Sequence, residues 1–232
     1  MAFPTQSIDF EKGSTQYAAI SNASQTGLSF TDIMTLEGWF KFESNTGTYL
    51  ISKRAPTSNQ RSYSLSTAIT TINLDTFFNG LNTGCSVSVA WTPSLATWYH
   101  IAVTKNGTSV KFYVNGVQQG TTQTGTNGTI STGTAAFEIA TSSTDPGGEY
   151  DGRMVLVRAW NTERTQTEIN NNKCLILGAT GGLVGEWGFS GAYTDNSGNG
   201  NTLTGVNTPT FGSDVPNLCS GVAESPNFFM FF

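Results

Sequence analysis

The chain has 232 residues, of which 12% are charged and 37% are apolar, and its formal net charge at neutral pH is −5. It has no cluster of Lys or Arg to displace counterions from phosphate, which argues against a nucleic-acid partner and against an anionic membrane surface. No segment approaches the roughly 18 apolar residues of a membrane span, and the N-terminus lacks the basic start and apolar core of a secretory signal peptide.

Short segments that alternate between apolar and polar residues recur along the chain, separated by turn-forming residues. A period of two is typical of strands with one buried face, and the abundant Thr, Ser, Gly and Asn are poor helix formers. No alternation of strands with long helices appears, which excludes a doubly wound parallel sheet. The expected strands are residues 7–10, 17–20, 34–42, 48–52, 62–66, 71–74, 85–89, 98–104, 110–114, 117–119, 137–140, 153–160 and 183–189.

The strongest turn signals lie in the middle of the chain. Asn106-Gly107 and Asn115-Gly116 each follow an expected strand. Asn-Gly is favoured in tight hairpins because both central residues of such a turn need positive φ angles. We therefore predict three consecutive antiparallel strands, that is, a meander.

One short helix is expected at residues 165–171. Thr165 and Glu168 have the spacing of a capping box, in which each side chain binds the free backbone N–H of the other residue. Residues 178–182 are typical of a link, and residues 194–201 form a loop rich in Gly and Asn.

The three cysteines, Cys85, Cys174 and Cys219, form no Cys-x-x-Cys pair, and the chain has one histidine. A zinc site of the usual Cys/His type is therefore excluded. Two states remain open: three reduced and buried thiols, which we favour, or one disulfide, with Cys174 and Cys219 as the pair to consider.

The hairpin Trp98-Tyr-His-Ile-Ala-Val-Thr … Val110-Lys-Phe-Tyr-Val-Asn-Gly116 resembles the signature of laminin-G-like jelly-roll domains, in the concanavalin-A-like lectin/glucanase superfamily. Other segments agree in the same order. Residues 7–10 resemble the family's opening strand, 35–40 the strand that ends in a buried Trp, and 150–161 the aromatic-x-Gly strand with its Trp-Asn turn. The resemblance covers roughly residues 7–205.

The resemblance implies an all-β fold, namely an antiparallel two-sheet β-sandwich of the concanavalin-A-like jelly-roll type with one short helix. We expect a laminin-G-like domain at residues 1–212 and a C-terminal tail with an apolar end at residues 213–232. Residues 183–201 look like a segment that many relatives carry ahead of the first strand, so the order of elements is permuted here. Such folds host lectins, adhesins, enzymes and scaffolds, so the fold does not fix the function.

The pattern of carboxylates disfavours catalysis. Glycan-cleaving enzymes of this superfamily resemble one another in a Glu-x-Asp-x-x-Glu strand, whose carboxylates serve as nucleophile and acid. The nearest match here is Glu149-Tyr-Asp151, which is followed by Arg153 and Met154 and lacks the third carboxylate. We expect a protein that is not an enzyme, with a degenerate glycanase as the least favoured alternative.

The resemblance also makes calcium a candidate cofactor, because relatives bind Ca²⁺ with loop carbonyls and Asp side chains. The candidate ligands are Asp151, Asp195 and Asn199, which lie in loops beside Gly residues. Val155 and Leu156 stand where the family has an acidic pair. The alternative is a network in which these side chains bond to their own backbone.

A glycan site needs exposed aromatic rings beside amides and carboxylates. Trp91, Tyr63 and Tyr193 border turns and are the candidate ligand-binding residues. His100 alternates with its neighbours in a strand and is expected to be structural. By resemblance, the other four tryptophans are expected to pack in the interior: Trp39, Trp98, Trp160 and Trp187.

The apolar end of the tail lies outside the resemblance and would be an aggregation hazard if left in water. We therefore name its residues as candidate subunit contacts: Phe228, Phe229, Met230, Phe231 and Phe232. With the low charge, this favours a non-catalytic structural module, such as a virion-type decoration, fibre or attachment subunit that assembles with other protein subunits. The alternative is a glycan-binding, lectin-like adhesin, with or without calcium dependence. We expect the protein on a virion, outside the cell or at the cell surface.

Overall fold

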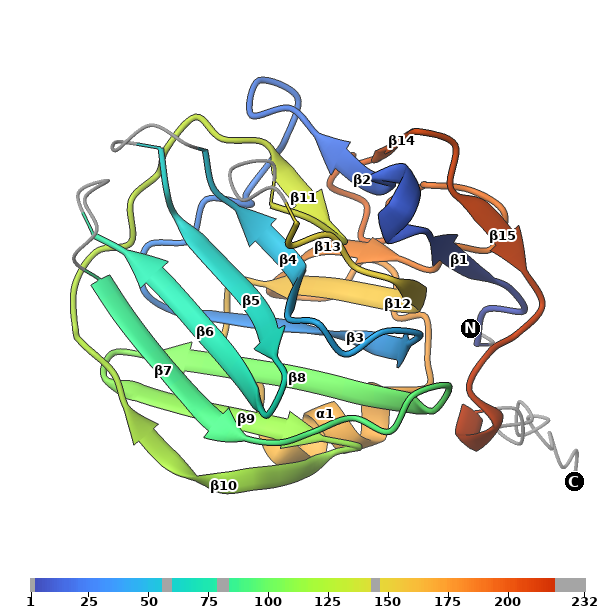
Figure 1. The fold of residues 1–232 in the computed structure, drawn as a ribbon. Coiled ribbons are helices and arrows are strands. Elements are labelled where there is room, and N and C mark those ends of the chain that lie inside the picture. Colours follow the sequence, from blue (N-terminus) through green and yellow to red (C-terminus); the bar gives the residue numbers. More distant parts are fainter. Residues whose placement is uncertain (1–2, 56–59, 79–83, 143–146, 220–232) are drawn as a thin grey trace, which may run out of the picture.

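The computed structural model describes residues 3–55, 60–78, 84–142 and 147–219, which form two antiparallel β-sheets packed face to face (Figure 1). The eight-stranded sheet has the order β10-β9-β8-β3-β12-β1-β15, and β13 also pairs with β12. Its strands are β1 (Ser7–Phe10), β3 (Met34–Phe42), β8 (Trp98–Asn106), β9 (Ser109–Val114), β10 (Val117–Thr124), β12 (Gly152–Trp160), β13 (Leu183–Trp187) and β15 (Thr210–Gly212).

The seven-stranded sheet has the order β14-β2-β11-β4-β5-β6-β7, and β4 to β7 lie in the foreground of Figure 1. The predicted jelly-roll sandwich is thereby confirmed. The strands of this sheet are β2 (Tyr17–Ile20), β4 (Thr48–Lys53), β5 (Tyr63–Ala68), β6 (Thr71–Phe77), β7 (Gly84–Ala90), β11 (Phe137–Ile139) and β14 (Thr204–Val206).

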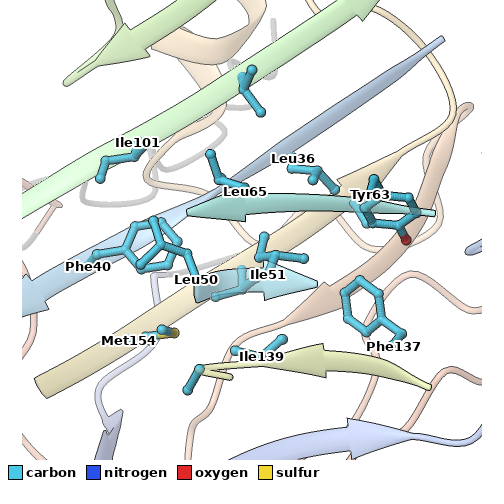
Figure 2. Packing of buried hydrophobic residues seen from close by; sticks show 14 of the residues in the cluster. Leu36, Phe40, Leu50, Ile51, Tyr63, Leu65, Ile101, Phe137, Ile139 and Met154 are labelled. Carbon is cyan, nitrogen blue, oxygen red and sulfur yellow. The ribbon is translucent and has the colours of Figure 1, made fainter. Parts of the chain in front are cut away.

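The core lies between the sheets and is built by the inward residues of both. Phe40, Ile101 and Met154 come from the eight-stranded sheet, whereas Leu65 and Ile139 come from the seven-stranded one (Figure 2). All five have no exposed area. Each buried side chain of this size contributes about 1.5–3 kcal/mol relative to an exposed one, so this layer supplies most of the stability of the sandwich.

The predicted meander is β8-β9-β10. Val114 lies opposite Val117, and the two residues of the turn, Asn115 and Gly116, have φ angles of 54° and 82°. These positive values are the ones that a tight Asn-Gly hairpin requires. The sequence did not predict β14 and β15, whose three residues each are too few to show a period of two.

The outer face of the eight-stranded sheet is covered by α1 (Gln166–Asn172) and by the residues that follow it. The helix begins at the predicted capping box, in which Thr165 and Glu168 bond reciprocally. Ile169 packs on Ala102 and Tyr113 of the sheet. Two short 3₁₀ turns, η1 (Lys12–Ser14) and η2 (Asn217–Cys219), complete the described helices.

Cys174 and Cys219 form a disulfide, so the favoured expectation of three reduced thiols is wrong. Both cysteines pack with Trp39 and Val155 against the outer face of the eight-stranded sheet. This shared docking site brings together two residues that are 45 positions apart. Cys85 is a buried free thiol.

The end of the chain continues from β15 along the sandwich. Asp214, two residues beyond β15, accepts hydrogen bonds from Lys41 and from Trp98. The predicted subunit contacts from Phe228 to Phe232 lie outside the described residues. Within the described ranges, no helix has the length and apolar content needed to cross a membrane.

Candidate functional site

A buried ionic network occupies the covered face of the eight-stranded sheet. Glu37, Arg158 and Glu186 lie opposite one another on β3, β12 and β13. Arg158 Nε is 2.8 Å from Glu186 Oε1, and Arg158 Nη1 is 3.3 Å from Glu37 Oε1. Trp160 Nε1 donates to Glu37 Oε1 at 2.9 Å, and His100 Nε2 lies 3.4 Å from Glu37 Oε2. Glu186 also accepts hydrogen bonds from backbone N–H groups of the covering segment, which it holds in place.

The charge states of this network follow from burial and from its pairing. Burial alone would raise the pKa of Glu37, but the adjacent His100 and the charge of Arg158 outweigh it and hold that pKa at about 2. Burial lowers the pKa of His100, so this imidazole is neutral at pH 7 and its contact with Glu37 is not an ion pair. Because these side chains have no access to solvent, the network is structural, as predicted for His100.

The outer face of the seven-stranded sheet carries polar side chains instead. On β6, Ile72 and Leu74 are buried in the core, so the alternate residues Asn73 and Asp75 point away from it. Both are half-buried rather than covered. On this part of the face, described polar groups therefore remain within reach of solvent.

The neighbouring strand extends this polar surface. Asn73 lies opposite Ser88 of β7, and Asp75 lies opposite Ser86. Both serines are exposed. We call these four residues, Asn73, Asp75, Ser86 and Ser88, the polar patch. Amide, carboxylate and hydroxyl groups within one patch can donate and accept hydrogen bonds from a polyhydroxylated ligand.

Two aromatic rings and two guanidinium groups lie on the same sheet. Arg54 Nη1 donates to the hydroxyl of Tyr49 at 2.6 Å. The guanidinium carbon of Arg54 lies 5.1 Å from the ring centroids of Tyr49 and of Phe77. Arg61 approaches the Phe77 ring to 5.8 Å. Phe77 lies two residues beyond Asp75, on the same side of β6, so this group adjoins the polar patch.

Two cavities are formed by residues of the seven-stranded sheet. One of about 310 Å³ lies at the end of β4 and β5 and is lined by Tyr49, Ser66 and Thr67, together with Gly147 and Gly148. A second of about 430 Å³ lies near the β14 edge. Its lining includes an aromatic ring, a carboxylate and a hydroxyl, from Tyr17, Glu138 and Thr204.

The three aromatic residues that were predicted to bind a glycan do not form one site. Tyr63 is fully buried and its hydroxyl donates to the backbone oxygen of Leu28 at 2.8 Å, so the expectation that its ring is exposed is wrong. The physical reason is its position in β5, where it shares a face with the core residue Leu65. Trp91 is half-buried against Phe42, and Tyr193 is half-buried on a separate loop.

The four tryptophans expected in the interior divide into two kinds. Trp39, Trp160 and Trp187 have no exposed area, as predicted. Trp98 is half-buried, and its Nε1 donates to Asp214 Oδ1 at 3.1 Å. It therefore anchors the chain after β15 rather than filling the centre of the core.

Two of the candidate calcium ligands, Asp195 and Asn199, lie in one loop after β13. Asp195 Oδ1 accepts from the N–H groups of Glu186 and Ser197 at 3.0 and 2.9 Å, and Oδ2 accepts from Asn201 N at 2.8 Å. The side-chain amide of Asn199 donates to backbone oxygens of β13. These side chains therefore bond to the backbone, which was the stated alternative to calcium binding.

The third candidate ligand, Asp151, lies elsewhere. It precedes β12 by one residue, whereas Glu186, which bonds Asp195, lies opposite Arg158. Seven residues of strand separate the two positions, roughly 20 Å at the usual rise per residue. The structure therefore does not bring the three predicted ligands together.

Asp151 adjoins a group of acidic residues that the sequence did not single out. Ligand oxygens of Asp9, Glu11 and Glu43 lie within 4.8 Å of one another. Burial, together with the nearby charge of Asp151, raises the pKa of Asp9 and of Glu43. Asp9 Oδ1 is buried and accepts no hydrogen bond. These hard oxygen donors fit the preference of calcium.

The carboxylates of the seven-stranded sheet come from separate strands. Glu138 lies on β11 and Asp75 on β6, which are three strands apart in the sheet. In the predicted near-match, Tyr150 between Glu149 and Asp151 is fully buried and donates its hydroxyl to the backbone of β3.

The polar patch was not predicted from the sequence, although the sequence contains a signal for it. The alternation in residues 71–74 and 85–89 gives each strand one polar face. Consecutive strands are usually neighbours, so Asn73, Asp75, Ser86 and Ser88 could have been placed on one face. The contact of Arg54 with Phe77 had no such signal, because it joins residues of different strands whose register the sequence does not show.

Comparison with known proteins identifies a matching family and similar folds. A family model described as the concanavalin A-like lectin/glucanases superfamily matches residues 12–170. A crystal structure of a proposed carbohydrate binding protein from Bacteroides ovatus is similar, with a TM-score of 0.69 and 18% identity. That match covers 90% of this chain and 60% of the other, so the chain spans less than two thirds of that protein.

A second similar structure is the native heptameric SAP-like pentraxin from Limulus polyphemus. Its TM-score is 0.52 at 16% identity, covering 88% of this chain and 97% of the pentraxin. At these identities the likeness concerns the fold. No curated protein matches the chain.

Proposed function

This chain belongs to the concanavalin A-like lectin/glucanases superfamily, and we propose that it is a non-catalytic glycan-binding module. The proposed binding surface is the outer face of the seven-stranded sheet. The observation that carries the proposal is the polar patch beside the rings of Tyr49 and Phe77, on a face that the described helices leave uncovered. Sugars offer hydroxyl groups for hydrogen bonds and apolar ring faces for stacking, and this surface supplies partners for both.

Two further observations support this proposal over catalysis. The similar protein from Bacteroides ovatus is itself proposed to bind carbohydrate. The nearest match to the carboxylate pattern of the family's glycan-cleaving enzymes, Glu149-Tyr-Asp151, lacks the third carboxylate. A face with separated polar groups can bind a glycan without cleaving it.

Binding to a panel of soluble polysaccharides, measured by calorimetry, tests the proposal. The double variant Asn73→Ala/Asp75→Ala removes two polar groups of the patch, and we expect it to weaken binding at least about tenfold. The matched control is Thr122→Ala/Thr124→Ala, two exposed positions on β10 of the other sheet, which should bind as the parent does. If no polysaccharide binds, or both double variants bind equally, the proposed surface is wrong.

Calcium is a second part of the proposal. The acidic group of Asp9, Glu11 and Glu43 is a better donor set than the loop of Asp195. Arg153 pairs with Asp9 Oδ2, but Asp9 Oδ1 has no hydrogen-bond partner among the described residues, whereas both oxygens of Asp195 accept hydrogen bonds. A bound cation would offset the repulsion among these carboxylates and give the buried Asp9 Oδ1 a partner.

Assembly into a larger particle, as a virion-type subunit, stays a prediction, as does a location on a virion or outside the cell. The apolar end on which the assembly hypothesis rests lies outside the described residues. A glycan-binding face and an assembling tail are compatible, because the two are separate parts of the chain.

A further inference from the structure

The side chain of Arg54 is held in a fixed position on the proposed binding face. Its guanidinium group stacks at 5.1 Å on the rings of both Tyr49 and Phe77 and donates through Nη1 to the Tyr49 hydroxyl. An arginine between two rings loses little further conformational freedom when it binds a ligand, so it is prepared for recognition.

Among the residues that the structure describes, no carboxylate pairs with the positive charge of Arg54. Arg153, Arg158 and Arg164 each lie within 4.0 Å of an acidic side chain, whereas Arg54 lies within that distance of none in the described ranges. Its Nε is buried and makes no hydrogen bond. Arg61 adds a second positive charge at the same Phe77 ring.

The cavity beside Tyr49 has the same electrostatic character. Its lining consists of hydroxyl-bearing residues and glycines and includes no acidic side chain. Lys12 stands at the other side of this cavity, where its Nζ donates to the backbone oxygen of Gly147 at 2.7 Å and to Thr46 Oγ1 at 3.1 Å. Lys12 likewise has no carboxylate within 4.0 Å of Nζ among the described residues. The backbone N–H of Lys12 also donates to Asp151 Oδ1 at 3.2 Å, so a carboxylate lies near Lys12, and Arg54 is the main positive charge beside this cavity.

We propose that the glycan bound by this face carries an anionic group, a carboxylate or a sulfate, which binds at Arg54 beside the cavity of Tyr49, Ser66 and Thr67. This inference rests on the proposed glycan-binding function and names the class of its ligand. A planar carboxylate, or two oxygens of a sulfate, matches the paired N–H groups of a guanidinium. The hydroxyl groups of the cavity then bind the neutral part of the sugar, and Lys12 adds longer-range attraction.

Two matched pairs of polysaccharides test the proposal, measured by calorimetry on the full chain. Polygalacturonate against its methyl ester isolates the carboxylate, and dextran sulfate against dextran isolates the sulfate. We expect the anionic member of at least one pair to bind about tenfold more tightly than its neutral counterpart, with a preference that weakens as NaCl is added. The pair that shows the preference identifies the group.

Substitutions test whether Arg54 is responsible for the preference for anionic polysaccharides. Arg54→Gln is expected to abolish it, whereas Arg54→Lys keeps the charge, loses the paired N–H geometry and retains a smaller preference. The control Lys173→Gln, beyond α1 on the opposite side of the molecule, should leave it unchanged. If Arg54→Gln does not fold, Lys12→Gln takes its place, with a partial loss expected.

The outcomes separate this inference from the proposed function. Equal binding of neutral and anionic members, or a preference that survives Arg54→Gln, overturns the anionic ligand but leaves glycan binding in place. Binding of none of the four polysaccharides, when neutral glycans of the wider panel also fail, overturns both.

Discussion

Single residues of this sandwich show how charge is tolerated in its interior. Glu37 and Arg158 are buried, yet neither is left alone. Arg158 donates to Glu186 and to backbone oxygens of the covering segment, and Glu37 Oε1 accepts from Trp160. A buried ion pair of this kind adds little net stability compared with apolar packing, but the loss of one partner leaves an uncompensated charge. The network is therefore sensitive to pH.

We predict that acid destabilises the protein through Glu37. Its folded-state pKa of about 2 lies below the ordinary value of 4.5, so it stabilises the fold above pH 4.5, and this contribution is lost as the pH falls from 4.5 towards 2. The loss amounts to about 3 kcal/mol, since each pKa unit corresponds to about 1.4 kcal/mol. The lowered pKa of His100 acts in the same direction below pH 6.5, because the unfolded chain takes up that proton first.

The measurement is the free energy of unfolding from pH 7 to pH 3 for the parent and for Glu37→Gln. The variant should be less stable at pH 7 and should depend less on pH. Glu163→Gln, which removes a half-exposed pair with Lys111, is the control and should cost less than about 1 kcal/mol. Parallel curves for the parent and Glu37→Gln would show that Glu37 titrates normally.

Calcium binding is also decided by single residues. We predict that millimolar Ca²⁺ raises the melting temperature and that EGTA reverses the rise, because the cation offsets repulsion within the acidic group around Asp9. Glu43→Gln should abolish the rise, whereas Asn199→Ala should preserve it. If the melting temperature responds to neither Ca²⁺ nor EGTA, the proposal that the protein binds calcium is wrong.

At the scale of elements, α1 and the residues after it act as a cover for one sheet. Trp39 Nε1 donates to the backbone oxygen of Lys173 at 2.6 Å, Arg158 donates to that of Asn172, and Cys174 is bonded to Cys219. The seven-stranded sheet has no such cover among the described elements, and it carries the candidate site. The contrast explains why one outer face is apolar and ionic while the other is polar.

Removing the disulfide is expected to destabilise the fold. Cys174→Ser/Cys219→Ser frees a loop of 45 residues in the unfolded chain, which lowers the free energy of unfolding by roughly 2–4 kcal/mol. Reductant should lower the stability of the parent to the same level and leave the double variant unchanged. A thiol count on the denatured chain gives the control, with one free thiol expected before reduction and three after it.

The whole molecule combines a β-sandwich with a C-terminal segment that ends in apolar residues. The described chain remains attached to the sandwich as far as Cys219, through Asp214 and through the disulfide. The apolar residues from Phe228 onward follow this anchor. If they mediate assembly, their removal should change the mass in solution without changing the fold.

We predict that the full chain assembles and that a chain stopped after Pro226 is a monomer with the same melting temperature. Apolar side chains at a free end lose water contact on docking, which is the driving force for the association. Light scattering gives the mass of both chains, and a full chain that stays monomeric would count against an assembling tail. The truncated chain should bind glycans as the parent does, because the polar patch is far along the sequence from the tail.

The fold class and several local features could be predicted from the amino-acid sequence alone. The period of two placed most strands, Asn115-Gly116 marked a hairpin, and Thr165 with Glu168 marked the start of α1, because each of these depends on neighbours within a few residues. The resemblance of the central hairpin then supplied the sandwich.

Contacts between side chains of different strands could not be predicted in this way and became apparent in the folded structure. The burial of Tyr63, the pairing of Cys174 with Cys219, the ionic network of Glu37 and the stacking of Arg54 on Phe77 all join segments distant in sequence. A period of two states which residues share a face of one strand, but the register and order of strands fix which side chains meet. The candidate glycan-binding site depends on these contacts between strands, so it could be identified only from the folded structure.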